Sequence, residues 1–322
     1  MASVTSADVA RAAGVSRTTV SYVLNDTPGA SVSEATREHV RATASRLGYA
    51  PSAAARTLRR GRSDLVVCVL PDWPTGPVVD SLLDHLTDVL AERGLFVLVH
   101  HHRDSRALAE LWRAVTPRAV VGLAPFLPAD VRAMEQAGIA VVGSVESADG
   151  GAFDRSQHDL AVLQVDHLTA RGHRWVAFAT TTDGRLRRFG DARFAGVRDA
   201  CAARGLPEPR QAAVRTDEPA GATVRSWHAS GVTAVAAYND EVALALLAGA
   251  RDAGLAVPDD IAVIGVDDAP AARVTTPPLT TVAQPVTAQS EHLAASVLAV
   301  LDGHGRPPWP DDPARVVVRS ST

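Results

Sequence analysis

Four polar side chains in a short segment near the N-terminus could hydrogen-bond to DNA. The outer face of a helix expected near residues 17–24 carries Arg17, Thr18, Ser21 and Tyr22. Guanidinium and hydroxyl groups donate to base edges and phosphates, and a major groove admits the first turn of such a helix. The alternative is a small helical hairpin with a solvated polar face, because such pairs are common.

Residues 5–25, which must position these side chains, have the pattern of a helix, a tight turn and a second helix. Gly14 separates two short apolar runs with helical spacing, Thr5 and Asp8 fit a capping box, and Ser16 can cap the second helix. This pattern predicts a helix-turn-helix. Its inward faces would be formed by Val9, Ala10, Ala13, Val20, Val23 and Leu24.

A third helix is expected to close this small core. Ser33 can cap it, Val40, Ala44 and Leu47 are spaced for one face, and Gly48 would end it. Three short helices bury little surface, so we expect the head to be only marginally stable by itself.

The segment that follows, residues 51–62, is expected to be a hinge. Pro51 favours an extended residue before it, and the helix predicted from residues 53–60 is only about two turns long. A helix this short is marginal in water, so we expect it to form only when DNA supports it.

Charge is divided unevenly along the chain. Residues 1–62 contain nine arginines against four acidic residues, a net charge of +5, whereas the whole chain carries −4 and the remainder therefore −9. A basic head on an acidic body predicts that a polyanion binds at the N-terminal end.

From residue 63 onward, apolar runs alternate with amphipathic stretches. This alternation predicts an α/β body of parallel sheets covered on both faces. Strands are expected near residues 65–71, 95–101, 119–125, 140–146, 175–181, 234–238 and 261–267, and helices near 79–93, 130–137, 161–171, 194–204 and 240–253.

The order of several motifs resembles that of the lac repressor/galactose repressor family of bacterial transcription regulators. The matching segments are DVARAAGVS, TVSYVLN, VSEATREHV, LGYAPSAAAR, YNDEVALALL, GVDD and PPLTTV. The resemblance implies an all-α head (1–50), a hinge helix (51–62) and a periplasmic-binding-protein-like body (63–322) for effector binding and dimerisation. It places one subdomain at about 63–155 and 286–313 and the other at about 156–285 and 314–322. The strand crossings around the ligand cleft are expected near 153–158, 283–286 and 313–315.

In the family, a hinge leucine is wedged between base pairs in the minor groove, and Leu58 occupies the matching position. An apolar wedge kinks DNA at a flexible step, although Leu58 could instead pack against its own protein. Tyr22 stands where the family very often has arginine, so the preferred half-site would differ from that of relatives. The residues assigned to DNA are Ser6, Ser16, Arg17, Thr18, Thr19, Ser21, Tyr22, Asn25, Ser33, Thr36, Ser52, Ala55, Arg56 and Leu58.

Three polar residues at the ends of βα units form the predicted effector site: Arg193, Asn239 and Asp267. Each alone is more often a cap or turn residue, but together at the family's positions they are expected to line a polar cleft. Gln284 and Trp73 are weaker candidates.

The family's Asp-Asn and following Gly near the first crossing are absent. Ser156, Gln157 and Leu160 stand in that region, so the pocket either differs in chemistry or is degenerate.

Catalytic and metal sites are not predicted. His100, His101 and His102 would point to opposite faces of a strand end, and no Gly-rich phosphate loop or nucleophile elbow follows a strand. We therefore expect no enzyme activity, cofactor or metal. Cys68 and Cys201 lie in separate apolar contexts, which predicts reduced core residues.

The chain shows no signal segment, no apolar run long enough to span a bilayer and no C-terminal leucine heptads. These features predict a cytoplasmic dimer.

The predicted function is a repressor that binds a palindromic operator as a dimer and responds to a small molecule, most often a sugar. A purine-type corepressor or an unresponsive pocket is the alternative. A sugar-binding transport protein would need a signal peptide, and an α/β enzyme would need a catalytic site.

Overall fold

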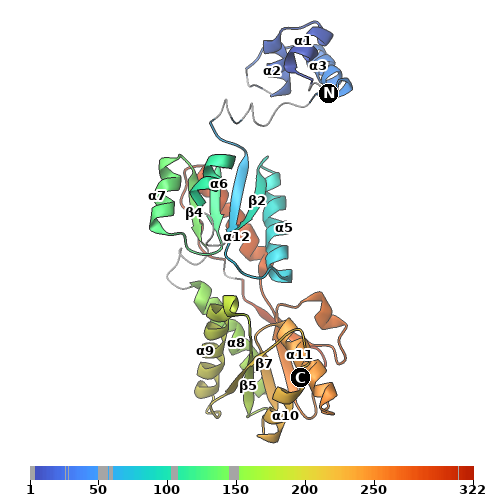
Figure 1. The fold of residues 1–322 in the computed structure, drawn as a ribbon, viewed down its shortest axis with the longest axis vertical. Coiled ribbons are helices and arrows are strands. Elements are labelled where there is room, and N and C mark those ends of the chain that lie inside the picture. The colour runs from blue at the N-terminus through green and yellow to red at the C-terminus, as the bar shows by residue number, and fades with distance from the viewer. Residues whose placement is uncertain are drawn as a thin grey trace. The chain divides into compact units, whose positions relative to one another are not determined.

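A computed structural model describes residues 4–25, 27, 29–49, 57, 61–102, 108–144, 152–310 and 312–322. The chain divides into two compact units, residues 1–64 with 113–117 and residues 65–112 with 118–322 (Figure 1). In the first unit the Ser63 amide donates to the Thr116 carbonyl, 2.9 Å away. A helical head and an α/β body with mostly parallel sheets confirm the predicted fold class.

The head contains three helices, α1 (Ser6–Ala13), α2 (Arg17–Leu24) and α3 (Glu34–Arg46). Its predicted caps are confirmed, because the Asp8 carboxylate accepts the Thr5 amide (3.0 Å) and the Ser16 hydroxyl oxygen accepts the Thr19 amide (3.0 Å). Ser33 caps α3 in the same way at 3.3 Å. The predicted inward residues form the head core, with Val9, Val20, Val23, Val40 and Ala44 among them.

The body begins with a four-stranded parallel sheet in the order β2-β1-β3-β4, which we call the sheet of the first lobe. Its strands are β1 (Leu65–Leu70), β2 (Phe96–His101), β3 (Ala119–Gly122) and β4 (Ala140–Ser144). The neighbouring helices are α5 (Pro77–Ala91), α6 (Leu108–Val115), α7 (Pro128–Gln136) and α12 (Val286–Leu301). Helix α12 packs against α5, β3 and β4, which brings a segment from late in the chain into this lobe.

The sheet of the second lobe has the order β10-β9-β8-β7-β5-β6, and only β10 runs antiparallel. Its strands are β5 (Val176–Thr181), β6 (Arg210–Val214), β7 (Ala234–Ala237), β8 (Ala262–Val266), β9 (Thr280–Ala283) and β10 (Arg315–Val317). Its helices are α8 (Ala152–Ala170), α9 (Arg187–Ala203), α10 (Gly221–Ala229) and α11 (Asp240–Asp252). Two 3-10 turns lie at Gly184–Leu186 and Pro270–Arg273.

Two expectations about the start of helices need correction. Residues 153–158, expected to be a strand crossing, lie in α8, which starts at Ala152 and packs against α9 and the second sheet. Helix α9 starts at Arg187, so Arg193 lies inside the helix and not at its start. Both helices extend further toward the N-terminus than their apolar periodicity indicates, because their first turns carry polar residues.

Both cysteines are buried free thiols, as predicted. Burial raises the pKa of the Cys68 thiol to about 12 and that of Cys201 to about 11. These thiols therefore behave as small core residues. In the described part of the chain, no helix combines the length and apolar character needed to cross a bilayer.

Candidate ligand pocket and DNA-binding surface

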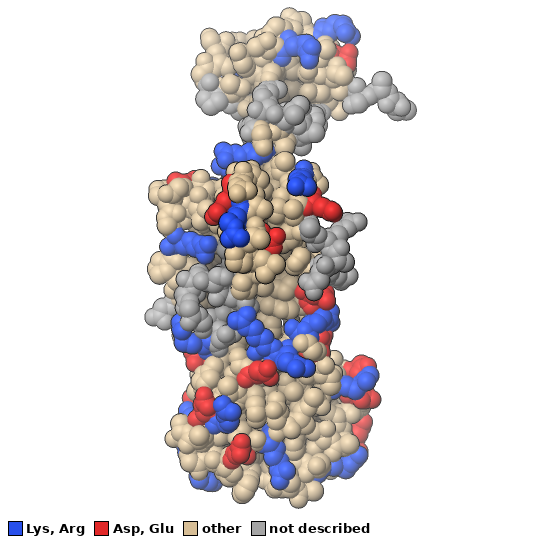
Figure 2. All heavy atoms as spheres, turned by 60° about the vertical axis from the view of Figure 1, so that its left-hand side comes forward, with Lys and Arg blue, Asp and Glu red and all other residues tan. Residues whose placement is uncertain are grey.

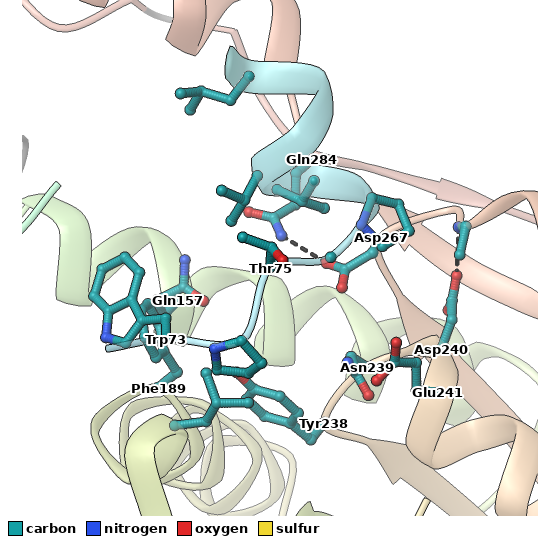
Figure 3. Close-up of a pocket in the computed structure, with 18 of the residues that line it drawn as sticks. Trp73, Thr75, Gln157, Phe189, Tyr238, Asn239, Asp240, Glu241, Asp267 and Gln284 are labelled. Carbon is teal, nitrogen blue, oxygen red and sulfur yellow. Dashed lines mark hydrogen bonds between the residues drawn. The ribbon is translucent and has the colours of Figure 1, made fainter. Parts of the chain in front are cut away.

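A pocket of the body brings all five predicted effector residues together. Its lining includes Trp73, Arg193, Asn239, Asp267 and Gln284. Figure 3 labels four of these residues, Trp73, Asn239, Asp267 and Gln284. Three of them follow the adjacent parallel strands β7, β8 and β9, whose carboxyl ends meet at one edge of the sheet. The cavity volume is about 190 Å³, which is far more than one water needs.

The other lining residues come from both lobes. They are Pro74, Thr75, Gly76, Pro77, Val78, Val79, Leu82, Leu123, Gln157, Leu186, Phe189, Tyr238, Asp240, Glu241, Ala269, Gln289 and Trp309. A mostly apolar wall with a few polar groups is typical of a site for a small organic ligand.

Arg193 donates hydrogen bonds to two uncharged groups of the protein, a glutamine side chain and a backbone carbonyl. Its Nε and Nη2 donate to the Oε1 of Gln157 at 3.0 and 2.8 Å, and its Nη1 donates to the Tyr238 carbonyl. The guanidinium carbon lies 4.6 Å from the centre of the Tyr238 ring, and the side chain is 4% exposed. These contacts stabilise a buried positive charge by hydrogen bonds and a cation–π interaction.

Asp267 follows β8 in a left-handed backbone conformation, with φ of 114°. The Nε2 of Gln284 donates to its Oδ1 at 2.7 Å, as the dashed line in Figure 3 shows. Burial raises the pKa of Asp267, while the charge of Arg193 and the Gln284 bond act in the opposite direction. The second carboxylate oxygen can accept a ligand hydroxyl.

Asn239 has a structural task as well as a place in the pocket. Its Oδ1 accepts the amide of Val242 at 3.0 Å, so the residue caps α11. Its Nδ2 group donates to none of the described residues, which leaves a donor for a ligand oxygen.

Asp240 connects three segments that carry pocket residues. Its Oδ1 accepts the Thr281 hydroxyl of β9 at 2.6 Å, and its Oδ2 accepts the Ala269 amide after β8 at 2.7 Å. The side chain is 1% exposed, and burial raises its pKa to about 7. A β-carbon on Gly265 would lie 2.1 Å from the Asp240 Oδ1, so only glycine fits beside this carboxylate.

Two aromatic rings from different lobes meet at one end of the pocket. Trp73, after β1, and Phe189, in α9, have ring centres 4.7 Å apart with an angle of 75° between the planes. Figure 3 shows them at the end opposite Asn239, Asp240 and Glu241. Trp73, a weaker candidate from the sequence, therefore lines the pocket.

Sequence reasoning did not assign Gln157, Tyr238 or Glu241 to the pocket. Gln157 lies in α8, 36 positions before Arg193 in the chain. Tyr238 and Glu241 lie within two residues of the predicted Asn239, so their position at the end of β7 could have identified both as pocket residues. No local signal pairs Gln157 with Arg193.

The departures from the family pattern fall in different places. Gln157 lines the pocket, whereas Leu160 is 3% exposed within the core of the second lobe. Ser156 is not among the lining residues. Only one of these three positions therefore changes the chemistry of the pocket directly.

Across the described residues, no group of three or more His, Cys, Asp or Glu side chains is placed to hold a metal ion.

The head presents the predicted donors at the start of α2. Arg17 and Thr18 are exposed, Tyr22 is 41% exposed, and Ser21 is half-buried. In the view of Figure 2 the head shows mostly basic side chains with little acidic surface, whereas both signs of charge are mixed over the body. This arrangement leaves the first turn of α2 open to a nucleic acid.

Several other residues assigned to DNA have bonds within the head. Ser16 and Ser33 cap helices, and their hydroxyl oxygens lie 2.8 Å from those of Thr19 and Thr36. The Nδ2 of Asn25 donates to the Ser21 carbonyl at 2.7 Å. Ser6 is the first residue of α1 and is half-buried. The assigned hinge residues Ser52, Ala55, Arg56 and Leu58 lie outside the described residues.

Comparisons with known proteins match both parts of the chain. The family of bacterial regulatory proteins called the lacI family matches residues 5–52, and a periplasmic binding protein-like domain matches residues 165–322. The transcriptional regulator reg1 of Streptomyces lividans is 30% identical, in an alignment that covers 98% of this chain and 96% of that protein.

Solved structures share the fold. The lac repressor dimer bound to operator and the anti-inducer ONPF has a TM-score of 0.78 at 24% identity, with 99% of each chain covered. A complex of the transcriptional regulator CelR with cellobiose has a TM-score of 0.63 at 25% identity, covering 99% of this chain and 100% of that one. The chain therefore belongs to the lacI family of bacterial regulatory proteins and is a DNA-binding transcriptional regulator, not an enzyme.

Proposed function

We propose that this regulator is a repressor that binds a palindromic operator as a homodimer and that a sugar in the pocket changes its DNA affinity. One observation carries the proposal: a head with exposed donors on α2 and a pocket with polar side chains at the ends of three adjacent strands occur in the same chain. We also propose that it acts in the cytoplasm, where operator DNA is found.

Arg17 is proposed as the main base-contacting residue. It is exposed at the first position of α2, and an arginine there can donate two hydrogen bonds to guanine. Thr18, Ser21 and Tyr22 would contact neighbouring bases or phosphates. The other assigned head residues lie near helix N-termini or the end of α2, and backbone amides at helix N-termini favour phosphate groups.

Leu58 is proposed to enter the minor groove from the hinge at residues 51–62. The proposal rests on the family position of this leucine and on the basic residues around it in the sequence. Leu58→Ala should weaken operator binding, because the wedge that kinks the central step is lost. Unchanged operator affinity would contradict this role.

A sugar is the proposed effector because the pocket combines aromatic rings with amide and carboxylate groups that exchange hydrogen bonds with hydroxyls. CelR, which shares the fold at 25% identity, was solved with cellobiose.

The proposed dimer uses the first lobe. Strand β2 lies at the edge of its sheet, and it exposes Phe96 (64%) and Val99 (37%). An exposed apolar edge strand is a template for pairing, and a second copy of the chain would cover it together with α5.

We further propose the division of the chain into a head (1–50), a hinge (51–62) and an effector-binding body (63–322).

The proposed switch couples the two sites. If a ligand changes the affinity for operator by some factor, operator must change the affinity for that ligand by the same factor. The coupling can therefore be measured from either side.

A fluorescence-anisotropy selection from a library of palindromic DNA tests the proposal. We expect the protein to select a palindrome with a flexible central step, and one member of a panel of sugars and nucleobases to change the affinity. Arg17→Ala should lose discrimination between half-sites, whereas the exposed body variant Arg251→Ala should retain it. A protein that binds all sequences equally would contradict the proposal.

A further inference from the structure

We propose that the pocket accepts an uncharged or cationic polyhydroxylated ligand and excludes anionic ligands such as sugar phosphates and uronic acids. This inference rests on the proposed effector function of the pocket and specifies the charge of the ligand. It follows from how the charged groups of the lining are already bonded.

Arg193 is the single cation among the described lining residues, and the Nε and Nη2 side of its guanidinium is occupied. An arginine holds a carboxylate or phosphate through two parallel N–H groups. Here the Nε–H and Nη2–H pair donates to the Oε1 of Gln157 at 3.0 and 2.8 Å. The Nη1 group also donates to the Tyr238 carbonyl. Three of the five N–H groups of Arg193 are therefore used within the protein, including the Nε–H and Nη2–H pair that would hold an anion from the side.

The carboxyl groups of the lining outnumber this guanidinium. Glu241 and Asp267 both line the pocket, and the buried Asp240, which holds its proton up to about pH 7, lies beside them. Burial is the main cause of the raised pKa values of Asp267 and Tyr238; the charge of Glu241 adds to both shifts, and that of Asp267 adds to the shift of Tyr238. The negative charges of Glu241 and Asp267 would also repel an entering phosphate or carboxylate.

The free hydrogen-bonding groups suit hydroxyls and amines. Asp267 keeps one carboxylate oxygen beyond its bond to Gln284, and Glu241 is exposed in the lining. Both carboxylates accept hydrogen bonds, and a ligand hydroxyl or ammonium group can donate to them. The Nδ2 of Asn239 can donate to a ligand oxygen.

The test compares sugars that share stereochemistry and differ in charge. Each set contains a hexose, its 6-phosphate, its uronic acid and its 2-amino derivative, in the gluco, galacto and manno series, together with neutral disaccharides. Calorimetric titration of the full chain should find a neutral or amino sugar that binds, with the matched anions at least about tenfold weaker. Tighter binding of a phosphate or uronate would overturn the inference, as would the absence of binding by every neutral and amino compound.

Charge variants provide a second readout. Glu241→Gln combined with Asp267→Asn keeps the size of both side chains, and it should raise the affinity for the matched sugar phosphate about tenfold relative to the neutral sugar. The control Asp252→Asn removes an exposed carboxylate at the end of α11 and should leave the ratio unchanged. If the double variant does not fold, Glu241→Gln alone, at an exposed position, should shift the ratio in the same direction. An unchanged ratio in the folded variant would overturn the inference.

Operator binding in the same preparation separates this inference from the proposed function. A protein that selects a palindrome but prefers anions keeps the repressor proposal and overturns only the charge selectivity. A protein without sequence-specific DNA binding contradicts the proposed function instead.

Discussion

At the scale of residues, the chemistry of the pocket depends on polar groups that are bonded to one another. Gln157 orients Arg193, Gln284 bonds to Asp267, and Asp240 accepts two hydrogen bonds from neighbouring segments. Buried polar groups are costly when one partner is removed, so these pairs should respond strongly to single substitutions.

Asp240 should make stability depend on pH. In the folded protein it holds its proton up to about pH 7, whereas the ordinary pKa of an aspartate carboxyl is 3.8. The folded state therefore binds more protons between these values, and the free energy of unfolding should fall as pH rises through this window, by on the order of a few kcal/mol.

Asp240→Asn imitates the protonated carboxyl and should remove this pH dependence. The melting temperature of the variant relative to the wild type should rise between pH 5 and pH 8, while Asp252→Asn should show no such trend. A difference that stays constant with pH would contradict the raised pKa.

Gln157→Ala should destabilise the body by about 2–3 kcal/mol, because two N–H groups of a buried guanidinium lose their acceptor. Urea denaturation of the full chain measures the effect. Gln289→Ala, also in the lining, serves as the control and should cost much less. Equal effects of the two variants would show that Gln157 does not hold Arg193.

At the scale of elements, the second lobe depends on close approach of helices. Helices α8 and α9 pack against each other, and a β-carbon on Gly196 of α9 would lie 2.3 Å from the His158 carbonyl oxygen of α8. A backbone oxygen on a packed helix cannot move aside alone, so the two helices would have to separate.

Gly196→Ala should therefore lower the free energy of unfolding by about 1–3 kcal/mol, despite the better helix propensity of alanine. The matched control is Gly184→Ala, where an added β-carbon meets no atom within 4 Å. Denaturation curves that coincide for the two variants would rule out the close packing.

At the scale of the whole molecule, the DNA-binding head is basic and the ligand-binding remainder of the chain is acidic. Residues 1–62 carry a net charge of +5, while the whole chain carries −4. DNA binding should therefore weaken steeply with added salt, because phosphate contacts release counterions, whereas ligand binding by the body should change little.

Arg17→Ala should reduce discrimination between the selected operator and a changed half-site by about 1–3 kcal/mol. Anisotropy titrations at several salt concentrations separate this effect from a general loss of charge. The variant Arg41→Ala, on the exposed side of α3, removes the same charge and should weaken all DNA sequences alike. Equal behaviour of the two variants would argue against base contact by Arg17.

Local patterns in the sequence determined the head, its caps and the buried strands of the body. Thr5 with Asp8, and Ser16 and Ser33 at helix starts, act within a few residues of one another, so their roles follow from spacing alone. Asn239 and Asp267 were also predictable as neighbours, because each follows an expected strand and the two strands end at one edge of a sheet. Gln284 was proposed from the family's strand crossing instead.

Short elements with weak apolar periodicity were not predicted. Strand β6 is an edge strand with mostly exposed residues, and β10 has only three residues, so neither shows the pattern of a buried strand. The first turns of α8 and α9 were missed because polar residues obscure their helical period.

Only the tertiary structure decided how the pocket is bonded and charged. The bond between Gln157 and Arg193, the contact of Trp73 with Phe189 and the bond between Asp240 and Thr281 join residues far apart in the chain. Such pairs have no local signal, because chain folding alone sets their distance. The sequence placed Arg193 at the ligand site, and the fold determined that its Nε–H and Nη2–H pair is bonded to Gln157.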